Sequence, residues 1–164
     1  MIYIDESGWG SLVGGVAVGL YNSQTGELFS EIIPVKYFQG KEFKNKTYLT
    51  KALEIVIDGM EEILMDNKIT ICRGYLLTKV RDYFMRYKDF KWQTAEIGEP
   101  LQGYLETVFA DHLKKIGIKA KSEGAHCLSF DDQLKWVRAR KSRVKYVKTG
   151  WGSWKKKYSK YGKK

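Results

Sequence analysis

The sequence has few residues that build sites from sulfur and imidazole. Its two cysteines, Cys72 and Cys127, are far apart and lack a metal-ligand spacing. Free thiols in a reducing compartment are therefore the simplest interpretation. The two histidines, His112 and His126, do not complete a zinc motif with them. These shortages argue against a disulfide framework and against a zinc site.

Long apolar runs and nucleotide-binding motifs are also missing. No run approaches the roughly 18 apolar residues that span a membrane. The chain begins directly in a predicted strand instead of a secretion signal, so we expect a soluble, cytoplasmic protein without a membrane partner. No Gly-x-x-x-x-Gly-Lys-Ser/Thr motif occurs, which argues against a kinase or NTPase. The 164 residues fit one domain with a hydrophobic core.

Acidic residues are absent from the C-terminal part of the chain. Residues 135–164 contain thirteen Lys or Arg and no Asp or Glu, whereas residues 1–134 contain sixteen basic and nineteen acidic residues. The net charge of +10 is thus concentrated at the C-terminus. Aromatic residues lie among these cations: Trp136, Tyr146, Trp151, Trp154, Tyr158 and Tyr161. Cations neutralise phosphates and rings stack on bases, so the pattern predicts nucleic-acid binding. A solvated charged face, a tail added for expression and an anionic membrane surface are less favoured alternatives.

The N-terminus places two carboxylates at the end of a predicted strand. Ile2 and Ile4 face one way in a β-branched and aromatic segment, which indicates a strand. Asp5 and Glu6 follow, and a Gly-rich turn then allows the backbone to approach a ligand closely. Two carboxylates after a buried strand are typical of a metal-dependent nuclease. Ordinary turn residues are the alternative, because Asp-x-Ser-Gly is also good turn chemistry.

Hydrophobic periodicity predicts alternating strands and helices in the rest of the chain. Pro34 is easiest to place on an edge strand or at a bulge. We expect an α/β fold in which helices flank a mixed five-stranded sheet over residues 1–142, with a basic aromatic extension over 143–164. Further strands are expected over 12–20, 27–37, 69–72 and 89–97, with a last short one over 118–121, and helices over 46–66, 75–87, 100–116 and from Ser129.

Acidic residues recur at a later strand tip and at the start of the last helix. With the first pair they form the set Asp5, Glu6, Glu96, Asp131 and Asp132. Residues at neighbouring strand ends converge on one edge of a sheet, and a helix N-terminus can join them. Such a cluster is stable mainly when divalent cations bridge it, and oxygen ligands favour Mg²⁺ or Mn²⁺.

Three points about this set stay open. Asp131 and Asp132 are equally well explained as residues that cap a helix. Glu99 and Glu106 compete with Glu96 as the ligand from the middle of the chain. If residues 69–72 form the fourth strand, its tip offers no acid.

The opening motif resembles that of ribonuclease HII, in the ribonuclease H-like superfamily. That motif typically reads Asp-Glu-Ala-Gly-Arg-Gly-Pro-Leu-Ala-Gly-Pro-Val. Residues 5–16 here read Asp-Glu-Ser-Gly-Trp-Gly-Ser-Leu-Val-Gly-Gly-Val. The resemblance implies that Asp5 and Glu6 are metal-site residues and that Gly8 to Gly10 approach the sugar-phosphate backbone. Trp9 replaces the family's arginine, and both prolines and a later Ala-Ala-Ser-Ile segment are missing.

The second half is loosely similar to RuvC-type Holliday junction resolvases. These have a glutamate at a strand end, a long helix, a short strand and paired aspartates that open the last helix. Glu96, the helix over 100–116, and Asp131 with Asp132 follow that order. A resolvase cuts two strands as a dimer, so this resemblance also implies a homodimer.

Together the resemblances imply a Mg²⁺- or Mn²⁺-dependent endonuclease acting on an RNA/DNA hybrid or on branched DNA. Two metal ions about 4 Å apart would activate water and stabilise the leaving oxygen. Asp5 would bridge the two ions. Glu6, Glu96 and one of Asp131 and Asp132 would be the other ligands. Of these two aspartates, Asp132 is assigned to the metal. The residues expected to hold the nucleic acid are Gly8, Trp9, Gly10, Arg138, Arg140, Lys141, Arg143, Lys148, Trp151, Trp154, Lys155, Lys156 and Lys157. A non-catalytic nucleic-acid-binding module on the same scaffold is the alternative.

Overall fold

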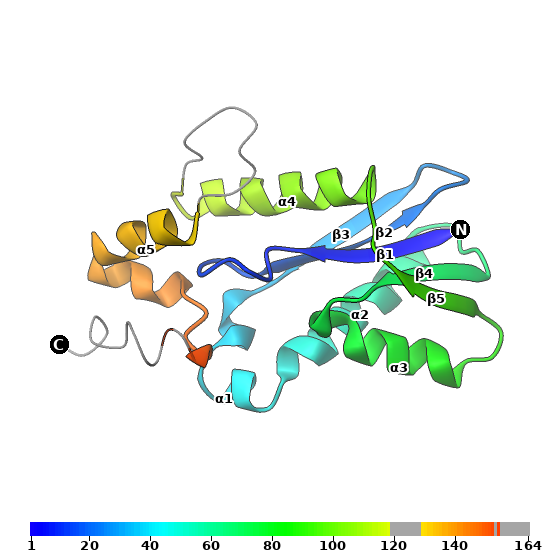
Figure 1. The fold of residues 1–164 in the computed structure, drawn as a ribbon, viewed down its shortest axis with the longest axis horizontal. Coiled ribbons are helices and arrows are strands. Elements are labelled where there is room, and N and C mark those ends of the chain that lie inside the picture. Colours follow the sequence, from blue (N-terminus) through cyan, green and yellow to red (C-terminus); the bar gives the residue numbers. More distant parts are fainter. Residues whose placement is uncertain (119–128, 153, 155–164) are drawn as a thin grey trace.

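Five strands form one mixed sheet in the order β3-β2-β1-β4-β5 (Figure 1). The computed structural model describes residues 1–118, 129–152 and 154. The first three strands form an antiparallel meander, and β4 and β5 run parallel to β1. The predicted α/β fold with a mixed five-stranded sheet is therefore confirmed. The strands are β1 (Ile2–Ser7), β2 (Val16–Asn22), β3 (Leu28–Ile33), β4 (Lys68–Cys72) and β5 (Lys91–Ala95).

Helices cover both faces of this sheet (Figure 1). One face packs against α2 (Thr47–Glu62) and α3 (Thr78–Arg86), and the other packs against α4 (Leu101–Lys115). Successive strand residues point to opposite faces, so Ile2 and Ile4 join the core on the α2 side. Tyr3 packs on the α4 side for the same reason. None of the helices in the described residues is long and apolar enough to cross a membrane.

Short elements lie at the end of the sheet where β1 finishes (Figure 1). They are the 3₁₀ helix η1 (Val35–Phe38), α1 (Gly40–Lys44), α5 (Phe130–Arg138) and the 3₁₀ helix η3 (Lys141–Tyr146). The side-chain amide of Gln39 donates to the carbonyls of Lys145 and Val147. Val147 also forms an isolated β-bridge with Val13. The first part of the predicted C-terminal extension is thus joined to the rest of the fold.

Most predicted elements are present with shifted boundaries. The strand expected from residue 12 begins at Val16, because residues 8–15 form the turn and loop that follow β1. The strand expected over 27–37 ends at Ile33, and Pro34 follows this edge strand. Gly117 ends α4 with a φ of 94°, as glycines after helices often do. The strand expected over 118–121 lies mostly outside the described residues.

Candidate active site

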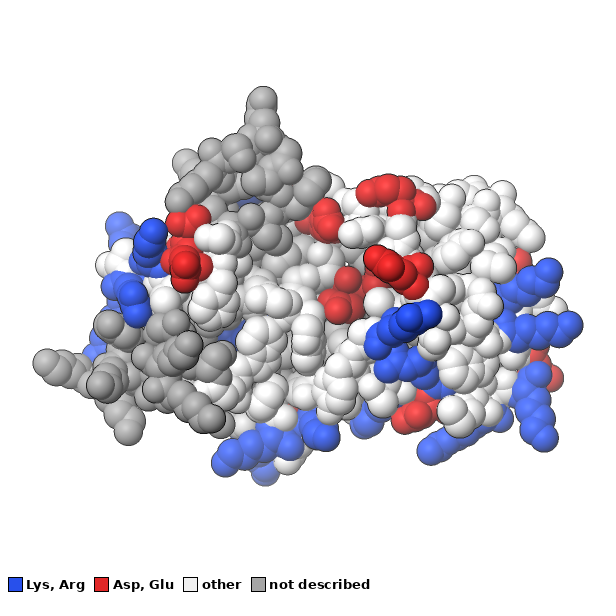
Figure 2. All heavy atoms as spheres, viewed as in Figure 1, with Lys and Arg blue, Asp and Glu red and all other residues white. Residues whose placement is uncertain are grey.

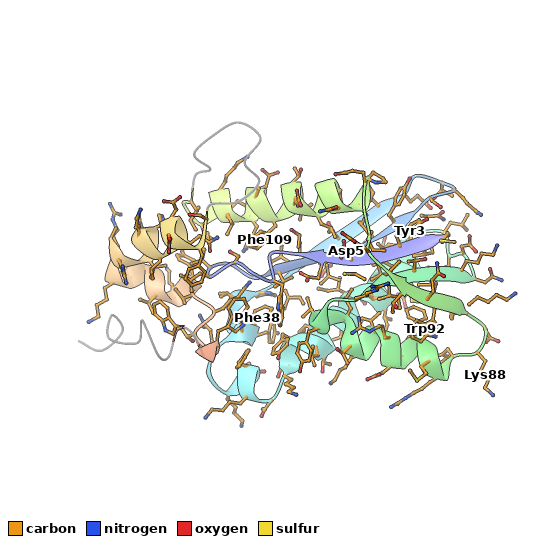
Figure 3. All side chains as sticks on the ribbon, viewed as in Figure 1. Tyr3, Asp5, Phe38, Lys88, Trp92 and Phe109 are labelled. Carbon is orange, nitrogen blue, oxygen red and sulfur yellow. The ribbon has the colours of Figure 1, made fainter. Side chains whose placement is uncertain are left out.

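Asp5 lies near the end of β1, the central strand, and is only 7% exposed. On one side it pairs with Gly19 of β2. On the other side is Cys72 at the tip of β4, whose thiol donates a hydrogen bond to the carboxylate. Figure 3 shows Asp5 beneath α4, beside the connection that leaves β5. Burial raises the pKa of Asp5, and hydrogen bonds from Cys72 and from the Glu6 backbone partly oppose this shift.

Glu6 is half-buried against the turn that follows β4. A Cβ atom placed on Gly74 would lie 3.3 Å from Glu6 Oε1, so the carboxylate packs closely against this turn. Glu6 Oε2 is fully buried and has no hydrogen-bond partner in the described part of the chain. Burial, and then the charge of Asp5, raises the pKa of Glu6 to about 7, although Lys148 and the Trp9 backbone N–H act in the opposite direction.

Cys72 is the last residue of β4 and lies beside Asp5. The fourth strand is indeed residues 68–72, so its tip carries no acid. Burial and the hydrogen bond to Asp5 contribute to raising the pKa of Cys72 to about 11. The thiol is therefore protonated at neutral pH and acts as a donor to Asp5.

Lys148 stabilises the turn after β1 through hydrogen bonds to its backbone carbonyls. Its Nζ donates to the carbonyl of Gly8 at 2.6 Å and lies 3.4 Å from that of Trp9. Lys148 is 0% exposed and Trp154 is 4% exposed, which corrects the prediction that they contact nucleic acid directly. Both side chains are part of the core instead. Gly8 is also structural, because its φ is 95° and a Cβ atom there would lie 2.6 Å from the Phe109 ring.

Trp9 is the centre of a group of aromatic rings that sequence reasoning missed. Its ring lies 5.7 to 6.3 Å, between centroids, from four others: Phe38, Tyr48, Tyr75 and Trp151. These four rings come from separate segments of the chain. Their contact with Trp9 could therefore not be predicted from any local sequence pattern. Gly10, the next residue, is exposed with open space around it.

Glu96 lies directly after β5 and is exposed. It lines a cavity of about 430 Å³ together with Glu99 and the rings of Tyr3 and Tyr21. Tyr3 is two residues earlier in β1 than Asp5. The register of the sheet pairs Cys72 of β4 with Ala95 of β5, so Glu96 comes one residue after the level of Cys72.

Asp131 and Asp132 occupy the first turn of α5, which confirms their interpretation as residues of a helix start. The Asp132 N–H donates to Ser129 Oγ at 3.2 Å, and the Ser129 hydroxyl donates to the Asp132 carboxylate at 2.9 Å. The next residue, Gln133, is 2% exposed. Its side-chain oxygen accepts from the Leu12 N–H at 2.8 Å and from the Ser11 hydroxyl at 2.9 Å. Gln133 was missed because a buried glutamine has no sequence signature.

Glu106 remains an alternative ligand from the middle of the chain. Leu105 and Phe109 of α4 pack on the sheet, and the Tyr104 hydroxyl bonds with Ser30 of β3 at 3.1 Å. The helical period places Glu106 on the other flank of α4, toward β1 and β4. Its carboxylate accepts a hydrogen bond from Gln102 at 3.3 Å.

The predicted basic residues fall into three groups. Arg138, Arg140 and Lys141 are exposed at the end of α5. Arg143 lies over the Trp136 ring, with 4.3 Å between the guanidinium carbon and the ring centroid, and donates to the Trp136 carbonyl. The third group, Lys155, Lys156 and Lys157, lies outside the described residues.

Asp5 and Glu6 are successive residues at the end of β1, and the charge of Asp5 acts on Glu6, whereas Glu96 follows β5 and Asp131 and Asp132 begin α5. Within residues 1–118, 129–152 and 154, no three His, Cys, Asp or Glu side chains are grouped closely enough to hold a metal ion. The pair itself offers oxygen donors of the kind that Mg²⁺ and Mn²⁺ prefer.

Comparison with models of known protein families gives no match, and comparison with curated proteins gives none either.

Proposed function

We propose that this protein is a Mg²⁺- or Mn²⁺-dependent endonuclease with a ribonuclease H-like fold that cleaves structured nucleic acid. The observation that carries the proposal is the Asp5 and Glu6 pair at the end of the central strand. Glu6 Oε2 is buried without a hydrogen-bond partner among the described residues, and Asp5 is almost fully buried beside it. A divalent cation would satisfy that oxygen and offset the repulsion between the carboxylates.

The strand arrangement supports the ribonuclease H-like assignment. An antiparallel meander of three strands is followed by two strands parallel to β1, which leaves β1 in the middle of the sheet. The motif over residues 5–16 that resembles ribonuclease HII spans the end of β1, the following turn and the first residue of β2.

The residues of this chain would act as follows. Of the ligands predicted from the sequence, Glu96, Asp131 and Asp132 are not grouped with Asp5 and Glu6 in the described part of the chain. Asp5 and Glu6 would hold the metal ions. When bound, such ions activate water for attack on a phosphodiester and stabilise the leaving oxygen. Lys148 fixes the turn that contains Trp9, and the Trp9 N–H orients the Glu6 carboxylate. The substrate would be an RNA/DNA hybrid or branched DNA, the latter cut by a homodimer.

Asp5→Asn tests the proposal. The amide keeps the shape of the side chain but removes its charge, so cleavage in Mn²⁺ should fall by more than about a hundredfold. Binding of the same oligonucleotides in EDTA should not change. The substrate panel includes duplex DNA, an RNA/DNA hybrid, a flap and a four-way junction. Asp58→Asn, at an exposed position on α2, is the matched control. Unchanged cleavage by Asp5→Asn would disprove the site assignment.

A non-catalytic nucleic-acid-binding module is the second candidate, and the cysteine at the tip of β4 favours it. A site with Cys72 in place of a third acid has fewer ligands for a hard cation. Calorimetric titration with Mn²⁺ separates the two candidates. The nuclease should bind the ion through Asp5 and Glu6, whereas the module should show no binding that depends on them.

A further inference from the structure

A second basic surface lies far in sequence from the basic C-terminus. Residues 35–46 contain Lys36, Lys41, Lys44 and Lys46, all exposed, and the single acid Glu42. They form η1, α1 and the residues that lead to α2, whose N-cap is Lys46. Figure 2 shows basic side chains along the edge of the molecule that α1 occupies in Figure 1.

This lysine-rich segment is bound to the first part of the C-terminal extension. The Gly150 N–H donates to the Phe38 carbonyl at 3.0 Å. A Cβ atom at Gly150 would lie 2.2 Å from the Phe43 ring, so the two segments are in close contact. Lys145 is also exposed and lies next to this segment. Its backbone carbonyl accepts a hydrogen bond from the side-chain amide of Gln39.

The same surface borders the aromatic rings around Trp9. Tyr75 is 47% exposed, and Trp9 and Trp151 are partly exposed. The Nζ of Lys46 lies 5.9 Å from the centroid of the Tyr75 ring. Gly74, next to Tyr75, borders the Glu6 carboxylate. Exposed cations, exposed rings and the candidate active site therefore follow one another across the surface.

We infer that this surface binds an unpaired stretch of a nucleic-acid strand. Lys41, Lys44 and Lys46 contact its phosphates, and a base stacks on Tyr75 beside Trp151. Phosphate contacts combined with ring stacking are the usual means of binding single strands. A base inside a duplex has both faces covered by its neighbours, so only an unpaired base offers a free face to Tyr75. A strand bound here would lead toward Asp5 and Glu6, so the inference adds to the proposed function the feature of the substrate that is recognised.

The experiment measures binding of the full chain to a fluorescent single-stranded oligonucleotide in EDTA, where no cleavage occurs. The variant carries Lys41→Gln, Lys44→Gln and Lys46→Gln. Loss of three phosphate contacts should lower affinity about a hundredfold at 0.1 M salt and reduce the slope of log K against log salt by about 2. The matched control carries Lys68→Gln, Lys88→Gln and Lys91→Gln, with the same charge loss. These exposed lysines lie at the far end of the sheet, where Figure 3 labels Lys88. The control should lose much less affinity.

Tyr75→Ala tests the stacking step. It should weaken binding of the single strand about tenfold and leave binding of a blunt duplex unchanged. Thermal unfolding of each variant checks the fold.

The inference is overturned if both lysine variants lose affinity equally, or if Tyr75→Ala affects single strand and duplex alike. It is also overturned if the first lysine variant loses binding to anionic vesicles while it keeps oligonucleotide binding. If these binding results hold and Asp5→Asn shows no cleavage defect, the proposed catalysis fails but this surface stands.

Discussion

At the residue scale, Asp5 and Glu6 are adjacent in sequence but differ in their surroundings. Asp5 receives a hydrogen bond from a neutral thiol, whereas Glu6 lies near an ammonium group and leaves one oxygen without a partner among the described residues. The raised pKa values of both carboxyls mean that protons and metal ions compete for this pair. Divalent cations should therefore bind more tightly as the pH rises through 7.

The raised pKa of Glu6 predicts a pH-dependent stability. The pKa of 4.5 rises to about 7 on folding, so the folded protein binds more protons than the unfolded chain between these values. The free energy of unfolding should then fall as the pH increases across this window, by about 3 kcal/mol at most. Glu6→Gln should remove this slope and be more stable than the parent above pH 7.

Denaturant unfolding in EDTA at pH 5 and pH 8 measures this effect. Glu61→Gln, at an exposed position of α2, serves as the control and should keep the slope of the parent. An equal pH slope for the Glu6→Gln variant and the parent would show that the buried carboxyl does not govern this dependence.

The position of Cys72 makes a second residue-level prediction. Cys72→Asp would add a carboxylate beside Asp5, across the β1 and β4 pair. The affinity for Mn²⁺ should rise about tenfold, because the number of charged ligands controls affinity at such sites. The variant without metal should be less stable than the parent, since like charges then lie together.

Isothermal calorimetry and unfolding with and without Mn²⁺ test this expectation. Cys72→Ser keeps the size of the side chain without adding charge, and it should leave the Mn²⁺ affinity nearly unchanged. Equal affinities for the Asp and Ser variants would place the cation elsewhere.

At the element scale, the elements that sequence predicted best have their own internal pattern. The alternation of Ile2 and Ile4 identified β1, and the apolar stripe of α2 identified that helix. The five-residue α1 and the 3₁₀ helix η3 were missed, because such short elements show little periodicity. Their conformation depends on contacts with distant segments, such as the bonds from Gln39 to the carbonyls of Lys145 and Val147.

The residues of the candidate site also differ in how well the sequence predicted them. The place of Asp5 and Glu6 at the end of a strand was predictable, because the alternation of Ile2 and Ile4 identified that strand. The expected approach of Glu96 and Asp132 depended on how β5 leaves the sheet and where α5 lies. Gln133 joins α5 to the loop after Gly10, so this helix contacts the turn through an amide while its acids cap its own first turn. No sequence spacing distinguishes these outcomes.

At the scale of the whole molecule, the exposed cations gather in several groups. The described cations include the exposed lysines of residues 35–46 and the exposed arginines at the end of α5. Figure 2 shows acidic side chains gathered near the middle of the same view, around the connection from β5 to α4. Figure 2 also shows basic side chains directly beside these acidic ones, so cations that can hold a polyanion lie both at the margins and next to the acidic group.

The last ten residues add six further lysines, and their removal tests this distribution. Deleting residues 155–164 lowers the net charge from +10 to +4. The cut follows Trp154, so this buried ring remains in the shortened chain. Binding to single strands and duplexes should weaken together, and the slope of log K against log salt for duplex DNA should fall by up to about 5.

Binding titrations in EDTA between 50 and 200 mM salt, about the range over which phosphate contacts dominate, measure that slope. The variant with Tyr158→Ala and Tyr161→Ala retains every charge and should keep the slope of the parent. Cleavage in Mn²⁺ at saturating substrate should persist in the deletion, since Asp5 and Glu6 lie in β1. If the slope is unchanged by the deletion, these lysines contact no phosphates, and the lysines of residues 35–46 and the arginines at the end of α5 account for binding.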